Sequence, residues 1–197
     1  RDLGLSQDLP GDICLVSGPA ALDLTYPVAL FDNVPFKALA KIDIDLPAGQ
    51  YGVEVQLAPS SGCNGTVAIS SVFPVNFGET STAFAHLDEF GNPTLTKFVN
   101  DVRPASPGTT RLFARHAAAF GDVNVLARQS KRNQVYIPGL GNGEQDGANI
   151  RPGTWWVSIF PAGSYHPAFS APLTLAANKA YFAYAVGTPA KGSFTVL

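Results

Sequence analysis

The chain has 197 residues, of which 46% are hydrophobic and 14% are charged, and its formal net charge at pH 7 is −2. This composition can build a folded core and excludes a disordered chain. The small net charge, with lysines and arginines scattered along the sequence, gives no electrostatic basis for binding nucleic acid or an anionic membrane, and no apolar run approaches the ~20 residues of a membrane-spanning helix.

The N-terminal segment, residues 1–9, shows little alternation of apolar and polar residues. Its large apolar side chains are Leu3, Leu5 and Leu9. We expect an extended arm that can add a strand to the sheet edge of a neighbouring copy.

Short β-strands are predicted through most of the chain. In Tyr51–Leu57, apolar side chains alternate with Gly52, Glu54 and Gln56, which is typical of a half-buried strand. Frequent glycines and prolines interrupt such segments, as they do in a sandwich of short strands. The best helical prospect, residues 117–119, allows one turn at most.

Two cysteines, Cys14 and Cys63, are present. Two buried free thiols are one reading, but a disulfide is favoured because the rest of the composition is that of a secreted protein. A disulfide that closes a loop of about 50 residues would stabilise the fold by about 4 kcal/mol in the chain-entropy model. A single pair provides no cysteine set for a metal.

The chain contains two copies of one pattern. The glycines of its clearest match are 153 − 49 = 104 positions apart, whereas later matches are 98 apart, so the first copy has about six extra residues, within 60–65, that include Cys63. The matching segments are Pro47–Val55 with Arg151–Ile159, Phe73–Phe77 with Ala171–Leu175, Thr82–Ala85 with Ala180–Ala183, and Leu22–Leu24 with Val123–Val125.

A stretch rich in proline, serine and glycine, residues 104–108, lies between the two copies and predicts a linker. We therefore expect one β-sandwich over 10–103 and a second over 109–197.

The repeated unit resembles a bacterial extracellular family known as domain of unknown function 4397. The likeness rests on short segments in both copies: Leu22–Leu24, Leu46–Tyr51 and Pro74–Gly78 in the first, and Arg115–Ala117, Asp122–Val125, Pro152–Trp155 and Leu173–Val186 in the second. It departs at Val16–Pro19, which replaces the family's His-Ala segment. The resemblance implies tandem immunoglobulin-like β-sandwiches on secreted or surface-attached proteins, with no established activity.

Signals for catalysis or metal binding are weak. His86, His116 and His166 have no partner at metal-ligand spacing, and we expect His116 to orient a turn by hydrogen bonding. The glycine-rich segment 139–147 reads as a flexible loop, with protein contact or calcium binding through Asn142, Glu144 and Asp146 as alternatives. No nucleophile elbow is present.

The polar segment 128–133 lies between two apolar segments and predicts a solvated hairpin tip. Docking of an acidic partner there is the alternative.

The adjacent tryptophans Trp155 and Trp156 must point to opposite faces of a strand. Trp155 shares its face with Val157 and Ile159 and is predicted to be core. Trp156 shares the other face with Ser158 and Phe160. We therefore take Trp156, Phe160 and the nearby Tyr165 as a candidate contact surface.

These observations favour a non-enzymatic structural or adhesive protein, secreted or on the cell surface, that binds itself or other cell-surface components and needs no cofactor. A chain that begins Arg1-Asp2 and contains no methionine is expected after removal of a secretory segment, or in an incomplete chain. Self-assembly into a filament or surface layer is a further hypothesis. The alternatives are a carbohydrate- or ligand-binding module that uses exposed aromatics and, third, a hydrolase.

Overall fold

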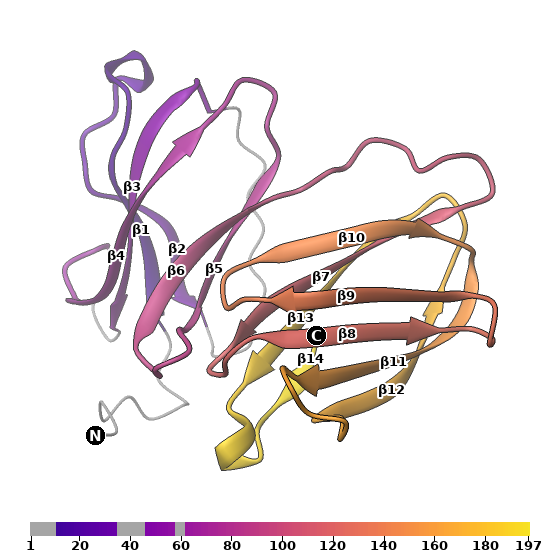
Figure 1. The fold of residues 1–197 in the computed structure, drawn as a ribbon. Helices are drawn as coiled ribbons and strands as arrows, with labels where there is room; N and C mark the ends of the chain where they lie inside the picture. Colours follow the sequence, from indigo (N-terminus) through magenta and orange to yellow (C-terminus); the bar gives the residue numbers. More distant parts are fainter. Residues whose placement is uncertain (1–10, 35–45, 58–61) are drawn as a thin grey trace. The chain divides into compact units, whose positions relative to one another are not determined.

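The computed structural model describes residues 11–34, 46–57 and 62–197 (Figure 1). The predicted contact residues Leu3, Leu5 and Leu9 lie outside these ranges. The regular secondary structure of the described residues is almost entirely β-strand, which confirms the all-β prediction. Their helical segments are two 3-10 turns, η1 (Ala20–Leu22) and η2 (Pro189–Lys191). No helix among the described residues is long and apolar enough to cross a membrane.

The chain divides into two compact units, residues 1–79 with 93–97 and residues 80–92 with 98–197. The first unit contains an antiparallel sheet in the order β2-β1-β3-β4. Its strands are β1 (Gly11–Ser17), β2 (Val28–Val34), β3 (Gly49–Leu57) and β4 (Thr66–Val75). The core on its inner face contains Leu15, Tyr51 and Val53, together with Leu95.

The second unit contains two four-stranded sheets, β10-β7-β13-β14 and β12-β11-β8-β9, whose inner faces share one hydrophobic core. β7 and β13 pair in parallel, and the other pairings in these two sheets are antiparallel. The strands are β7 (Thr110–Ala118), β8 (Val123–Arg128), β9 (Gln134–Leu140), β10 (Gln145–Ile150), β11 (Gly153–Pro161), β12 (Phe169–Leu175), β13 (Ala180–Gly187) and β14 (Thr195–Val196). β5 (Ser81–Leu87) and β6 (Pro93–Val99) form a separate two-stranded sheet.

The sheets β4-β3-β1-β2 and β12-β11-β8-β9 contain the same turn-like irregularity. Asn33 has φ 53° and Gly139 has φ 59°, each at a break in register between the last two strands of its sheet. Asp12 Oδ1 accepts the Asn33 N–H at 2.8 Å, and Asn124 Oδ1 accepts the Gly139 N–H at 2.9 Å. A side-chain oxygen thus satisfies the exposed backbone donor in both sheets.

The central strands β3 and β11 also begin alike. The Tyr51 hydroxyl donates to the carbonyl of Pro47 at 2.6 Å, and Trp155 Nε1–H donates to the carbonyl of Arg151 at 2.9 Å. Both rings are 2% exposed, and both bonds reach back four residues. A large aromatic ring is therefore buried without leaving its polar atom unpaired.

Two details of the sequence alignment are wrong. Gly49 pairs with Val75 and Gly153 with Leu175, so the first hairpin is longer by four residues (75 − 49 = 26 against 175 − 153 = 22), not six. The short match of Leu22 with Val123 fails as well. Leu22 ends the 3-10 turn, whereas Val123 begins β8, and the strand that corresponds to β8 by sheet position is β1.

No helix forms at residues 117–119, where one turn at most was expected. Ala117 and Ala118 belong to β7 and pair with Val186 and Gly187 of β13. Alanine has a high helix propensity, but the main-chain pairing with β13 decides the conformation here.

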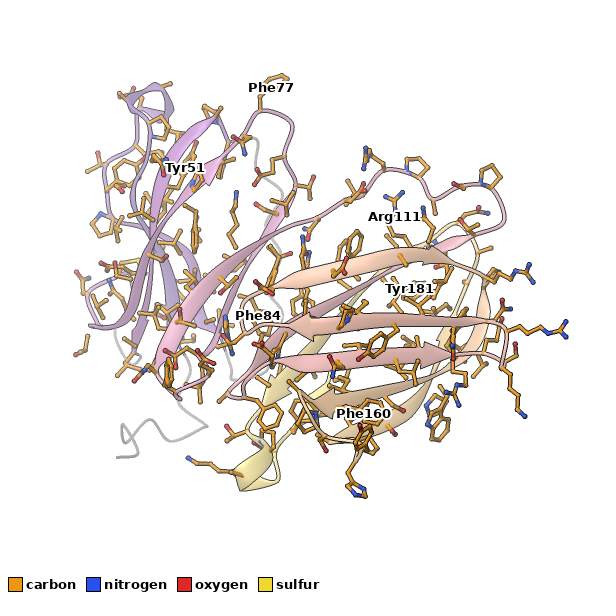
Figure 2. The ribbon with its side chains drawn as sticks, in the orientation of Figure 1. Tyr51, Phe77, Phe84, Arg111, Phe160 and Tyr181 are labelled. Carbon is orange, nitrogen blue, oxygen red and sulfur yellow. A yellow bond between two sulfur atoms is a disulfide. The ribbon has the colours of Figure 1, made fainter. Side chains whose placement is uncertain are left out.

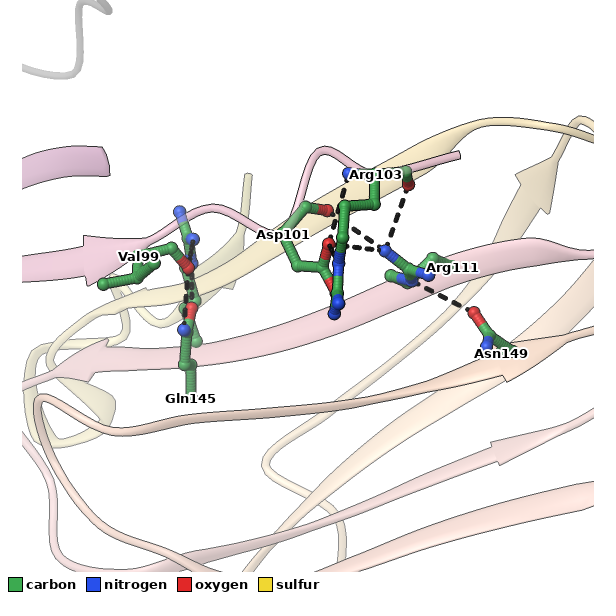
Figure 3. Close-up of polar contacts among 7 residues, drawn as sticks. Val99, Asp101, Arg103, Arg111, Gln145 and Asn149 are labelled. Carbon is green, nitrogen blue, oxygen red and sulfur yellow. Dashed lines mark hydrogen bonds and ion pairs between the residues drawn. The ribbon is translucent and has the colours of Figure 1, made fainter. Parts of the chain in front are cut away.

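The division between the units falls before the expected linker at 104–108. Figure 3 shows why residues 99–103 group with the second unit. Gln145 Nε2 donates to the Val99 carbonyl at 2.9 Å, and the Asp101 carboxylate binds Arg103 at 2.7 Å and Arg111 at 2.8 Å. These arginines hold the pKa of Asp101 well below its usual range, Arg103 chiefly through its hydrogen bonds.

Candidate functional site

The outer face of the sheet β12-β11-β8-β9 contains an exposed group of apolar side chains. Because side chains alternate along β11, Trp155, Val157 and Ile159 enter the core and are at most 8% exposed. Trp156 points outward and is 54% exposed. The structure therefore confirms the predicted environments of the two tryptophans.

Neighbouring strands extend this surface around Trp156. Trp156 pairs with Pro172 of β12, and Leu126 of β8 pairs with Tyr136 of β9, which is 57% exposed. Phe160, labelled in Figure 2, lies further along the outward side of β11 and is half-buried. We call these five residues the open face: Leu126, Tyr136, Trp156, Phe160 and Pro172.

Sequence reasoning missed three members of the open face, Leu126, Tyr136 and Pro172. The available signal was alternation in β9, where Tyr136 lies between the inward residues Val135 and Ile137. Tyr165, predicted as part of the surface, is 95% exposed but lies in the connection after β11 rather than on the sheet. It is therefore not part of the open face.

Polar groups around the open face are mostly uncharged. Ser158 and Ser170 share a hydrogen bond of 2.8 Å, and the hydroxyls of Thr154 and Thr174 are 3.0 Å apart. Arg128 pairs with Trp156 in the sheet register and adds one positive charge. This surface suits an apolar or neutral polar partner better than a strongly charged one.

The corresponding face of the first unit is covered over β1 and the end of β3. The predicted disulfide is present, and it joins Cys14, on the outward side of β1, to Cys63 in the β3–β4 connection. Gln56 Oε1 accepts the Gly65 N–H at 2.9 Å, which holds the same connection over β3. Cys14 is 0% exposed and Gln56 is 4% exposed, whereas Val72, which pairs with Gly52, is 63% exposed, so this face is buried over β1 and the end of β3 and open along β4.

Gly52 occupies the position of Trp156 in the first unit. A Cβ atom there would lie 2.4 Å from Ser17 Oγ and 3.1 Å from Val16 Cγ2. The absence of a side chain at Gly52 follows from the close approach of β1.

Two of the three histidines are partly or fully enclosed. His116 Nε2 lies 3.0 Å from the Gly121 carbonyl, which confirms that it orients a turn. Burial, the largest influence, lowers the pKa of His116, and it likewise lowers the pKa of His86. His166 is exposed. Within the described ranges, no group of three or more His, Cys, Asp or Glu could hold a metal ion.

The segment 139–147 is mostly strand rather than a flexible loop, because its ends belong to β9 and β10. Asn142 Nδ2 donates to the carbonyl of Ala118 at 2.6 Å, and Glu144 Oε2 accepts the Gly141 N–H at 2.9 Å. Asp146 Oδ1 accepts the Gly147 N–H at 2.7 Å. These side chains shape the turn and the start of β10, and calcium binding there stays untested.

The segment 128–133 forms the tip between β8 and β9, and most of it is exposed, as predicted. Docking of an acidic partner at this tip stays a prediction.

No protein-family model matches the chain, and no curated protein matches it. The resemblance to domain of unknown function 4397 therefore stays a prediction.

Proposed function

We propose that the protein is a non-enzymatic, extracellular structural or adhesive module, built from two copies of one β-sandwich unit, that binds through the open face. One observation carries the proposal. Trp156 and Tyr136 are more than half exposed on a sheet face whose counterpart in the first unit has no aromatic side chain at the Gly52 position and is partly covered by a disulfide-linked connection.

The energetics favour a contact surface. Burial of apolar area contributes about 25 cal/mol per Å², and tryptophan and tyrosine dominate the binding energy of protein interfaces. A second copy of this chain or another cell-surface component is the partner class, because most polar groups around the open face are neutral. The disulfide supports an oxidising, extracellular location.

The test is the double variant Trp156→Ala, Tyr136→Ala. Sedimentation velocity of the full chain, alone and with cell-envelope material, should show loss of association. The matched control is Phe77→Ala, because Phe77 is 97% exposed at the turn after β4 (Figure 2) and lies outside the open face. Equal association of both variants and the unaltered chain would contradict the proposal.

Carbohydrate binding is the second candidate function. The observation that favours it is the combination of two exposed aromatic rings with the neutral hydroxyls of Thr154 and Thr174. Aromatic faces pack against the apolar sides of sugar rings, and hydroxyls supply hydrogen bonds. A glycan-array signal that disappears in Trp156→Ala would favour this function over protein association.

A further inference from the structure

A lysine, a glutamate and an asparagine converge in the first unit. Lys97 of β6 places Nζ 2.5 Å from Glu79 Oε1, and Asn76 Nδ2 donates to Glu79 Oε2 at 2.7 Å. One carboxylate therefore bridges an amine and a carboxamide. Lys97 Nζ also lies 2.5 Å from the carbonyl of Pro74, two residues before Asn76.

Water has little access to the amine and the carboxylate. The side chains of Lys97 and Glu79 are 13% and 6% exposed. Asn76 lies on the surface of the turn, so ammonia released from its carboxamide can leave.

The turn that contains Asn76 is fixed. The Glu79 N–H donates to the Asn76 carbonyl at 3.1 Å, and Gly78 has φ 69°. Burial raises the pKa of Glu79, but the hydrogen bonds from Lys97 and Asn76 outweigh it, so the pKa lies below its usual value. Glu79 is thus held as a carboxylate, the form that accepts a proton.

We propose that Lys97 and Asn76 form an intramolecular isopeptide bond, with Glu79 as the proton carrier. The Glu79 carboxylate takes a proton from the Lys97 ammonium, and the neutral Nζ attacks Cγ of Asn76. Glu79 then protonates Nδ2 and accepts the second Nζ proton while the Cγ–Nδ2 bond breaks. The nitrogen of Asn76 departs as ammonia, which carries away the remaining proton as ammonium. No oxidant, reductant or added reactant is needed.

The link would join the end of β4 to β6 in the same unit. Closing a chain segment covalently restricts the unfolded state, as a disulfide does. This covalent restraint would suit a protein exposed to mechanical or proteolytic stress outside the cell, but the chemistry does not depend on the proposed function.

The direct test is the intact mass of the folded full chain after reduction of its disulfide. We expect a mass lower than that of the sequence by about 17 Da, the mass of ammonia. Digestion after glutamate separates residues 55–79 from residues 90–144, so the link would appear as one joined peptide connecting Asn76 to Lys97. A full sequence mass, with the two peptides free, would overturn the proposal.

Three variants separate this reaction from other losses of ammonia. Lys97→Gln and Asn76→Ala should restore the full mass, and Glu79→Gln should restore it while leaving nucleophile and carboxamide in place. Lys131→Gln, on the exposed β8–β9 tip, is the matched control and should keep the loss. A succinimide at the Asn64-Gly65 or Asn142-Gly143 pair also releases ammonia, and persistence of the loss in Lys97→Gln would assign it there and refute the link.

Discussion

The sheet β4-β3-β1-β2 of the first unit and the sheet β12-β11-β8-β9 of the second unit contain corresponding strands in the same order. Each has a positive-φ residue at the same break in register and an aromatic ring bonded four residues back at the start of its central strand. Their outer faces differ. The first is covered over β1 and the end of β3 by a disulfide-linked connection, and the second exposes Trp156 and Tyr136. One framework can thus cover part of the outer face of a sheet or leave that face available for contact.

The largest expected effect comes from removing the cover of the first sheet. The double variant Cys14→Ser, Cys63→Ser loses a link between residues 49 positions apart. The free energy of unfolding of the first unit should fall by about 4 kcal/mol, because the unfolded chain gains entropy. Urea unfolding followed by tryptophan and tyrosine fluorescence would measure this loss. Both tryptophans are in the second unit, so the tryptophan transition should stay unchanged while the part of the tyrosine signal from Tyr26 and Tyr51 shifts to lower urea. A shift of the tryptophan transition instead would contradict the account.

Gly52 of β3 and Trp156 of β11 occupy corresponding positions. Replacing each residue by the other should lower the free energy of unfolding by unequal amounts. Gly52→Trp should cost about 3 kcal/mol through overpacking, because Ser17 and Val16 occupy the space. Trp156→Gly should cost about 1 kcal/mol, the penalty of glycine in a strand. Chemical denaturation measures the free energy of unfolding of both variants. Equal losses would mean that the space above the two positions is equally open.

The side chains at the shared irregularity should have smaller effects. Asp12→Ala and Asn124→Ala each leave one backbone N–H without its acceptor. We expect a loss of about 1 to 2 kcal/mol for Asn124→Ala and a smaller loss for Asp12→Ala, because Asp12 Oδ2 is buried without a hydrogen-bond partner. Thermal unfolding midpoints provide the comparison. A neutral result in either sheet would show that its irregularity does not depend on the side-chain acceptor.

Acid should weaken only the second unit through its histidines, because all three histidines belong to that unit. Burial places the pKa of His116 in the folded protein below its value in the unfolded chain. The free energy of unfolding is therefore independent of His116 protonation above the histidine pKa of the unfolded chain, about 6.5. It falls as the pH drops below that value, by at most about 1.4 kcal/mol per pH unit.

Unfolding midpoints at pH 7.5 and pH 5 would measure this loss, and His116→Gln should flatten it. The first unit should show no histidine-dependent change, and a loss of the same size there would contradict the assignment.

Alternation in the sequence was sufficient to predict the all-β fold, the burial of Trp155 and the exposure of Trp156. The other members of the open face were not predictable. Leu126, Tyr136 and Pro172 join Trp156 only through the register of four strands. The disulfide was favoured from cysteine usage, but its role as a cover depended on Gln56 and Gly65, which have no distinctive spacing. Residues 117–119 were the best helical prospect by local propensity, which does not include the pairing of Ala117 and Ala118 with β13. Lys97, Glu79 and Asn76 gave no signal, since Lys97 lies in β6 and the other two lie in the turn after β4.

The most direct measurement of the central claim is acrylamide quenching of Trp156 fluorescence in Trp155→Phe as protein concentration rises, with and without cell-envelope material. The account predicts that Trp156 is accessible in the dilute chain and becomes protected as the chain associates. In Trp156→Phe, the remaining Trp155 should be protected throughout because it is core. Association that leaves Trp156 fully accessible to acrylamide would contradict the open face as the contact surface.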